Sequence, residues 1–385
     1  TVSWTYLTVP AGPAKWSRLA SGIAVPVPDD APETTLQVAR AVDWQPGDWI
    51  VVASTDFSED HQEFVQIESI DSDPAADVAT ITLNPETPLR HYHFGGPAPT
   101  QAGLAPRLAE CNGVALGDID VTGLPGSFCD SGAHNFGVDE RAEVGLLSRA
   151  IRLTATTSPA HPHYGGQIRI ESDVAAVAIE GVELENFGQA IRVDDHQSAY
   201  PIHFHHVHAV PPGSIVNSNS IHHTFNKCVV LHATDELTVE HNVCARNIGH
   251  AFYQELGNET GNAFHRNLVA GAMAPAFTPK KPEEMWLGDH LAGRIGYDGI
   301  NVVQTSPDGH GEKLAPSGFW IAHPGNAWRY NSVAGCQLQG RGYWIMPQTQ
   351  AASHSPFPEN GFDGNRVHGC YDGIDSGADA GAESP

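Results

Sequence analysis

Basic residues are scarce in this sequence: 385 residues contain 20 Lys and Arg against 45 Asp and Glu, which gives a formal net charge of −25. A nucleic-acid-binding protein needs a basic field to release counterions from phosphates. The charge therefore excludes that class, and a polyanionic partner is compatible only with a local arginine patch. Long apolar runs are absent too. Runs such as Trp49 to Ala53 are far below the roughly 18 to 20 residues of a membrane span, so we expect no membrane-spanning segment.

Cysteine pairs of the C-x-x-C type are also missing, which argues against a zinc ribbon or a thioredoxin-like site. The six cysteines are widely spaced, and an even number fits export and up to three disulfides. The chain begins at Thr1 without an initiator Met or a signal-peptide pattern, which we interpret as a mature secreted chain or an excised domain. We therefore predict an extracellular protein and leave the cysteine pairing open.

Segments with a strong helical period are absent, and Gly (39) and Pro (28) are scattered along the chain. Scattered breakers predict many short elements. The readable elements are strand-like and bounded by Gly, Pro, Asp or Asn: 35–38, 49–54, 63–70, 78–83, 151–154, 167–170 and 174–179. Because strands do not alternate with helices, a doubly wound or TIM-type fold is excluded and the all-β class is indicated.

An internal repeat organises the second half of the chain. Ser220 to His232 overlays Asn242 to Gln254 at an offset of 22 residues, and a further copy is recognisable at Gly181 to Val193, followed by an insertion over 194–213. Asn recurs near the turns between these short strands. A period near 22 with Asn and Gly corners is typical of a right-handed parallel β-helix, a solenoid of stacked coils. The alternative is a β-sandwich with chance self-similarity.

The N-terminal part has a different pattern, with short alternating strands and Pro-rich turns. We interpret residues 1–95 as an all-β cap domain, because a solenoid needs its open end covered. Residues 96–371 form the predicted β-helix. Residues 372–385, rich in Gly, Ala, Asp and Ser, are predicted to be a flexible tail.

Histidines are concentrated between residues 203 and 265, where an even distribution along the chain would place about four. Ten of the 22 lie between residues 203 and 265: His203, His205, His206, His208, His222, His223, His232, His241, His250 and His265. Stacked coils lie about 4.8 Å apart, so side chains from successive coils gather on an outward face. We expect this stacking to bring His203, His205, His222, His232 and His250 into one neighbourhood.

Three interpretations of this cluster stay open. The first is a divalent transition metal, zinc or a similar ion rather than calcium, on the candidate ligands His203, His205, His222, His223, His232 and His250. The second is acid/base chemistry on a glycosidic bond by His205, His232, Glu255, Asp194 and Asp195. The third is a structural role in side-chain ladders. No organic cofactor is expected.

Further residues are candidates for binding a sugar polymer. Arg192 could pair with a uronate carboxylate, with a salt bridge to Asp194 or Asp195 as the alternative. Trp320 and Trp344 could serve as stacking platforms, although most aromatic residues simply belong to the core.

Several stretches resemble one family. VDWQPGDWIVVASTDF from Val42 and LNPETPLRHYHFGG from Leu83 are similar to the eight-glycine domain, and YPIHFHHVH from Tyr200, SIHHTFNKCVVLHAT from Ser220 and LTVEHNVCARNIGHAFYQELG from Leu237 to the β-helix that follows it. Fibrocystin-like proteins, cell-migration-inducing hyaluronan-binding proteins and transmembrane protein 2 hyaluronidases share this architecture. The resemblance covers nearly the whole chain. One departure is Glu255-Leu256-Gly257, where the relatives tend to read Glu-Asp-Gly.

The resemblance implies a secreted hyaluronidase-like glycoside hydrolase that cleaves hyaluronan or a related acidic glycan in a groove on the β-helix, and we expect a monomer. From the residues alone, a β-helix polysaccharide lyase is equally allowed. A non-catalytic carbohydrate-binding or adhesion module is the alternative from another class, since fibrocystin-like relatives share the fold without an established activity. A purely structural metal that joins neighbouring coils is a further alternative.

Overall fold

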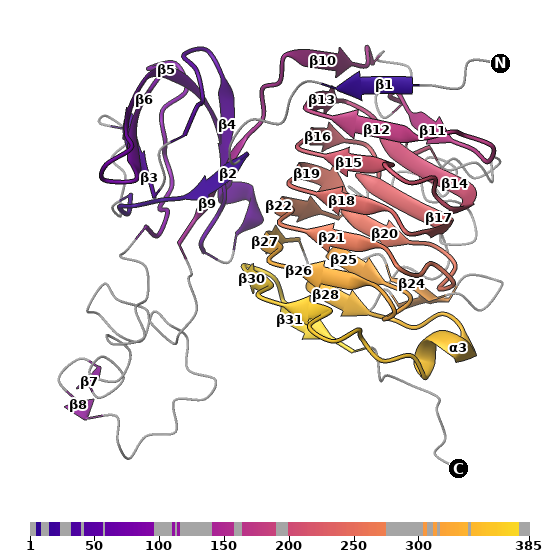
Figure 1. The fold of residues 1–385 in the computed structure, drawn as a ribbon. Coiled ribbons are helices and arrows are strands. Elements are labelled where there is room, and N and C mark those ends of the chain that lie inside the picture. The colour runs from indigo at the N-terminus through magenta and orange to yellow at the C-terminus, as the bar shows by residue number, and fades with distance from the viewer. Residues whose placement is uncertain are drawn as a thin grey trace, which may run out of the picture.

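The computed structural model describes residues 5–8, 15–23, 32–39, 42–56, 58–95, 110–111, 114–115, 141–157, 164–189, 199–274, 303–305, 311–313, 316–337 and 340–376. Three parallel sheets stack rung upon rung into a solenoid, and an antiparallel sheet lies beside it (Figure 1). The predicted all-β class, with a parallel β-helix and an N-terminal all-β domain, is confirmed. The described residues contain no helix with the length and apolar character that a membrane crossing requires.

Each coil of the solenoid contributes one strand to each of three sheets. Sheet 1 contains β1 (Thr5–Thr8), β12 (Val177–Glu180), β15 (Ile215–Asn217), β18 (Thr238–Glu240), β21 (Ala263–His265), β26 (Ala327–Arg329) and β29 (Phe362–Asp363). Sheet 2 contains β10 (Ile151–Thr154), β13 (Val182–Glu185), β16 (Ser220–Thr224), β19 (Val243–Ile248), β22 (Leu268–Met273), β27 (Ser332–Cys336) and β30 (Arg366–His368). Sheet 3 contains β11 (Ile168–Ile170), β14 (Ile202–Ala209), β17 (Val229–Asp235), β20 (Phe252–Gln254), β25 (Ser317–Ile321), β28 (Arg341–Ile345) and β31 (Asp372–Asp375).

The antiparallel sheet follows the order β2 (Trp16–Arg18), β9 (Glu143–Leu146), β4 (Trp49–Val52), β5 (Glu63–Asp73), β6 (Val78–Leu83) and β3 (Thr35–Val38). Two strand pairs, β7 (Glu110–Cys111) with β8 (Val114–Ala115) and β23 (Val303–Thr305) with β24 (Gly311–Lys313), and two short helices, η1 (Glu59–His61) and α3 (Gln350–Ser353), complete the described elements. The strands predicted at 35–38, 78–83 and 151–154 are confirmed to the residue.

Stacked aromatic rings fill the interior of the solenoid. Phe252 stacks on Phe319 with ring centroids 4.9 Å apart, and Phe319 stacks on Tyr343 at 5.0 Å. In sheet 1, Phe264 and Trp328 stack at 5.7 Å. Identical inward positions on successive coils are one strand spacing apart, so flat rings pack face to face along the axis.

A ladder of buried asparagines fixes the turn between sheets 1 and 2. Nδ2 of Asn219 donates to Oδ1 of Asn242, and the same contact links Asn242 to Asn267, Asn267 to Asn331 and Asn331 to Asn365, at 2.9–3.0 Å. Asn was predicted to recur at the turns, and the ladder explains why. Each amide satisfies buried backbone groups that a turn would otherwise leave unpaired.

The ladder also corrects the predicted repeat. The register pairs Ser220 with Val243, an offset of 23 residues, whereas the overlay of 22 paired Ser220 with Asn242. Aligning the chain on Asn219 and Asn242 would have given the right offset. Apolar residues occur on both strand faces here, since the outer face of sheet 2 is itself covered, so an apolar match alone did not fix the register.

The antiparallel sheet covers the outer face of sheet 2. Val51 and Ala53 of the N-terminal part form one buried cluster with residues of the solenoid, among them Val243, Leu268 and Ala270. Strand pairing does not follow the domain boundaries predicted at residues 95 and 371. Residues 143–146 pair within the antiparallel sheet, while 5–8 and 372–375 pair within the solenoid.

Two disulfides join neighbouring coils in the described residues, Cys228–Cys244 and Cys336–Cys370. The expected disulfide bonding is thus present, and spacing alone could not choose these pairs.

Candidate functional site

The outer face of sheet 3 gathers polar side chains from three coils. Ile202 and Phe204 of β14 belong to the buried core, so the alternate residues His203 and His205 project from the opposite face. The parallel register sets His205 beside His232 of β17 and Arg169 of β11 beside His203. Residues far apart in the chain thus meet on one surface, which we call the sheet 3 face.

A β-bulge adds a further imidazole to this surface. The pairing of β14 with β17 shifts between His205 and His208, and His206 has a positive φ of 53°. One extra residue in a strand redirects the side chains that follow it. The ring of His206 consequently lies 4.2 Å from that of His232 and 4.5 Å from that of His205, centroid to centroid.

Arg169, Glu171 and His205 form a charged network at the edge of the face. Nε of Arg169 donates to Glu171 at 2.5 Å, and Nδ1 of His205 lies 3.0 Å from the other carboxylate oxygen. With the proton on Nδ1, His205 donates to Glu171, and its Nε2 accepts from Nη2 of Arg169 at 3.2 Å. The hydrogen bond from His205, followed by the contacts from Arg169, lowers the pKa of Glu171. Glu171 is therefore an ionised group that orients the imidazole.

A second group consists of His203, His232 and Glu255. One carboxylate oxygen of Glu255 lies 3.3 Å from Nδ1 of His232 and 3.8 Å from Nε2 of His203. His203 is 4% exposed, and neither of its ring nitrogens makes a hydrogen bond to a described residue. Buried polar atoms are normally paired, so these two nitrogens are candidates for binding a ligand.

Both imidazoles of this group are neutral at physiological pH. Burial, together with the charges of His205 and Arg169, lowers the pKa of His203 to about 3. Burial and the charges of His206 and His205 lower the pKa of His232 to about 4. Neutral imidazole binds metals and accepts protons. One donor atom from each of His203, His232 and Glu255 lies within 4.8 Å of the others, and the same holds for His205, His206 and His232.

A separate cluster, Glu185, His222 and His223, lies on sheet 2. Nδ1 of His222 is 2.9 Å from Nδ1 of His223, and its Nε2 is 3.3 Å from Glu183. The prediction that His222 shares a neighbourhood with His205 and His232 is therefore wrong, because β16 faces a different side of the solenoid.

The carboxylates at this second cluster are paired with the guanidinium of an arginine. Arg152 contacts Glu183 at 2.9 Å and Glu185 at 2.5 Å, and the ring of His223 packs on Phe64 of the antiparallel sheet at 4.5 Å. These contacts place the cluster where the two domains meet, and one donor atom from each of Glu185, His222 and His223 lies within 4.8 Å of the others, as a metal site would require.

His250, Trp320 and Trp344 also differ from expectation. His250 is buried beside Trp320, with ring centroids 4.9 Å apart, and its Nδ1 contacts the hydroxyl of Ser317 at 2.8 Å. Trp320 and Trp344 are 2% and 0% exposed. A ring without an exposed face cannot stack on a sugar, so the predicted platforms are packing residues. Arg192, Asp194 and Asp195 lie outside the described residues.

Sequence reasoning missed Arg169, Glu171 and His206. Arg169 and Glu171 alternate with the buried Ile170 in a predicted strand, and this alternation was the available signal for two outward charges. His206 had no such signal, because only the bulge turns it toward the cluster.

Comparison with known proteins gives a consistent result. The model of the CEMIP beta-helix family matches residues 163–374. Over 353 residues the chain is 29% identical to the cell surface hyaluronidase of Danio rerio. This alignment covers 85% of this chain and 22% of that protein. The chain is 27% identical over 361 residues to the cell migration-inducing and hyaluronan-binding protein of Homo sapiens, with the same coverage, and 27% identical over 362 residues to human fibrocystin-L, of which it covers 7%. The chain thus spans about a fifth, or less, of the length of these relatives.

Proposed function

The chain belongs to the CEMIP beta-helix family, and on that premise we propose that it is an extracellular, hyaluronidase-like glycoside hydrolase. Its substrate is a polymer that contains uronate, and its site is the sheet 3 face. The observation that carries the proposal is the buried His203, whose ring nitrogens make no hydrogen bond within the described part of the chain, beside His232 and Glu255. The two disulfides and the cell-surface relative support the extracellular location.

Two imidazole–carboxylate pairs supply the proton transfers. In the hydrolysis of a glycosidic bond, water adds to the anomeric carbon, one group takes the proton of that water, and another donates a proton to the leaving oxygen. We assign these tasks to His205 with Glu171 and to His232 with Glu255, whose atoms lie 3.0 and 3.3 Å apart. Each carboxylate orients its imidazole, as in other acid/base pairs of this kind.

Arg169 is the cation we assign to the uronate carboxylate. Its side chain is 30% exposed and lies beside His205. A guanidinium binds a carboxylate in a two-pronged geometry, which orients the sugar over the imidazoles. Arg169 takes the role expected of Arg192.

His203, His232 and Glu255 also fit a divalent transition metal. Two neutral imidazoles and one carboxylate are suitable ligands, and the buried ring nitrogens of His203 make no hydrogen bond to a described residue. When bound, such an ion supplies Lewis-acid polarisation of a substrate oxygen. With an ion bound, His232 and Glu255 would serve as its ligands, while His205 with Glu171 would move protons and Arg169 would hold the polymer.

Incubation with hyaluronan, chondroitin, pectin and alginate, each with and without a chelator, tests the proposal. Chain length and the ultraviolet absorbance of unsaturated uronate are followed together. We expect shortening without new absorbance. Shortening with new absorbance would identify a lyase, and no shortening of any polymer would favour a non-catalytic carbohydrate-binding module. Loss of turnover in the presence of the chelator would support a metal ion bound at the site.

Single substitutions test the assignment of the site. His205→Ala and His232→Ala should lower turnover by about 10²-fold or more, since general acid/base groups contribute about 10²–10⁴, while polymer binding is largely kept. His354→Ala, which removes an exposed histidine after α3, is the matched control and should leave turnover unchanged. Equal turnover in all three variants would refute the site.

A further inference from the structure

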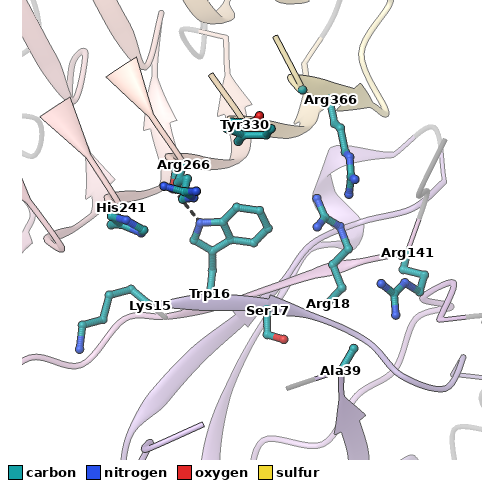
Figure 2. Close-up of a pocket in the computed structure, with 11 residues that line it drawn as sticks. Lys15, Trp16, Ser17, Arg18, Ala39, Arg141, His241, Arg266, Tyr330 and Arg366 are labelled. Carbon is teal, nitrogen blue, oxygen red and sulfur yellow. Dashed lines mark hydrogen bonds between the residues drawn. The ribbon is translucent and has the colours of Figure 1, made fainter. Parts of the chain in front are cut away.

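A cationic cavity of about 400 Å³ lies where the antiparallel sheet meets the turns between sheets 1 and 2 (Figure 2). Its size is within the range of small-molecule sites. Five of the chain's 20 Lys and Arg residues line it, and no described carboxylate does. These residues are Lys15, Arg18, Arg141, Arg266 and Arg366. In a protein with a net charge of −25, such a gathering needs a physical reason.

The solenoid repeat builds one wall of the cavity. His241, Arg266 and Tyr330 occupy the same turn on successive coils, each directly before an asparagine of the ladder, and each has a positive φ of 51–58°. The fourth position is Gly364, where a Cβ would lie only 2.3 Å from the ring of Tyr330. Glycine therefore makes room for the aromatic ring, and the left-handed turns repeat one side-chain direction from coil to coil.

The antiparallel sheet supplies the opposite wall. Nε1 of Trp16 donates to the carbonyl oxygen of Arg266 at 2.9 Å, the dashed contact in Figure 2, which ties the two walls together. The guanidinium of Arg18 lies 4.9 Å from the centre of the Trp16 ring. The side chains of Arg18 and Arg366 point toward one another in Figure 2. Buried Glu143 contacts Arg18 at 3.3 Å, which balances one positive charge of this wall.

We propose that this cavity binds an oxyanion carried on a sugar, the carboxylate or sulfate group of an acidic glycan. Guanidinium groups bind such oxyanions in a two-pronged geometry, and the exposed ring of Tyr330, 49% accessible, provides a face for the sugar. The cavity lies by the turns between sheets 1 and 2, whereas the proposed catalytic residues lie on sheet 3. The inference therefore does not depend on the proposed function.

Isothermal titration of the whole chain tests the inference with four probes: hyaluronan oligosaccharides, heparin oligosaccharides, a neutral cello-oligosaccharide and inorganic sulfate. The double variant Arg266→Gln/Arg366→Gln should weaken binding of an acidic oligosaccharide by at least about tenfold, because each charge-assisted hydrogen bond contributes strongly. Arg90→Gln/Arg246→Gln removes the same charge at exposed positions outside the cavity lining and should leave the affinity unchanged. Preference for heparin identifies sulfate as the recognised group, and equal binding of hyaluronan identifies carboxylate.

Tyr330→Asn separates recognition of the sugar from that of a bare anion. Asparagine tolerates the positive φ of this residue, so the variant should fold. We expect weaker oligosaccharide binding with sulfate binding unchanged. Unaltered oligosaccharide binding in the double variant, or binding of the neutral oligosaccharide with equal affinity, would overturn the inference, as would sulfate binding as tightly as every oligosaccharide.

Discussion

Replacing Glu143 with Gln should destabilise the junction between the two domains. Glu143 of β9 is 0% exposed, and its carboxylate accepts hydrogen bonds from Ser332 of β27 at 2.5 Å and His368 of β30 at 2.7 Å. Arg18 of β2 contacts it at 3.3 Å. One buried carboxylate thus joins two strands of the antiparallel sheet to two strands of the solenoid.

The magnitude follows from the pKa of Glu143. Burial would raise this pKa, but the charge and hydrogen bond of His368, with the charge of Arg18, outweigh burial and lower it to about 2, against an ordinary 4.5. At 1.36 kcal/mol per pKa unit, the ionised carboxylate contributes about 3 kcal/mol to the free energy of unfolding. Breaking a buried ion pair from one side costs a similar amount, about 3–5 kcal/mol.

The sign of the pH dependence is fixed by the direction of this shift. Because the pKa is lower in the folded state, the contribution is complete above about pH 4.5 and is lost as the pH falls toward 2. Urea unfolding of the wild type and Glu143→Gln should therefore differ by about 3 kcal/mol at pH 7 and by about 1 kcal/mol at pH 3. Glu86→Gln, at an exposed turn, should change stability by less than about 0.5 kcal/mol. A gap at pH 7 below about 1 kcal/mol, or one that stays constant with pH, would refute the reasoning.

Two further predictions concern the asparagine ladder and the second histidine cluster. Asn267→Leu should lower the free energy of unfolding by about 3 kcal/mol, because it leaves the buried Asn331 and Asn242 groups without partners, whereas Asn365→Leu at the half-buried last rung should cost less in the same urea titration. His222→Ala should lower the melting temperature and leave polymer turnover within about twofold, because the cluster lies on sheet 2. A loss of turnover as large as that of His232→Ala would contradict this prediction and show that His222 contributes to the reaction.

The class of fold and several strand positions could be predicted from the sequence because they depend on local signals. Breakers bound the strands, alternation marks their faces, and Asn marks the turns, as at Asn219 and Asn242. Strand partners could not be predicted in the same way. Glu143 lies on β9, which joins an antiparallel sheet whose other strands lie 60 or more residues earlier in the chain. No pattern within the sequence of β9 indicates that it pairs with those strands.

The histidine site shows the same division between local and long-range information. His222 and His232 are ten residues apart in sequence, yet the chain passes from sheet 2 to sheet 3 between them. His205 and His232 are 27 residues apart, and the parallel register makes them neighbours. In a solenoid, proximity follows the coil period rather than the distance along the chain.

The coil period therefore decides which histidines can act together, and the environment of each decides its chemistry. His222 has Glu183 and His223 within hydrogen-bonding distance, and Arg152 balances the adjacent carboxylates, so its polar atoms are satisfied within the chain. His203 is equally buried but has no hydrogen-bond partner among the described residues for either nitrogen. Sequence composition treats these two residues alike, and only the pairing of strands distinguishes the imidazole that is hydrogen-bonded within the chain from the one that is not.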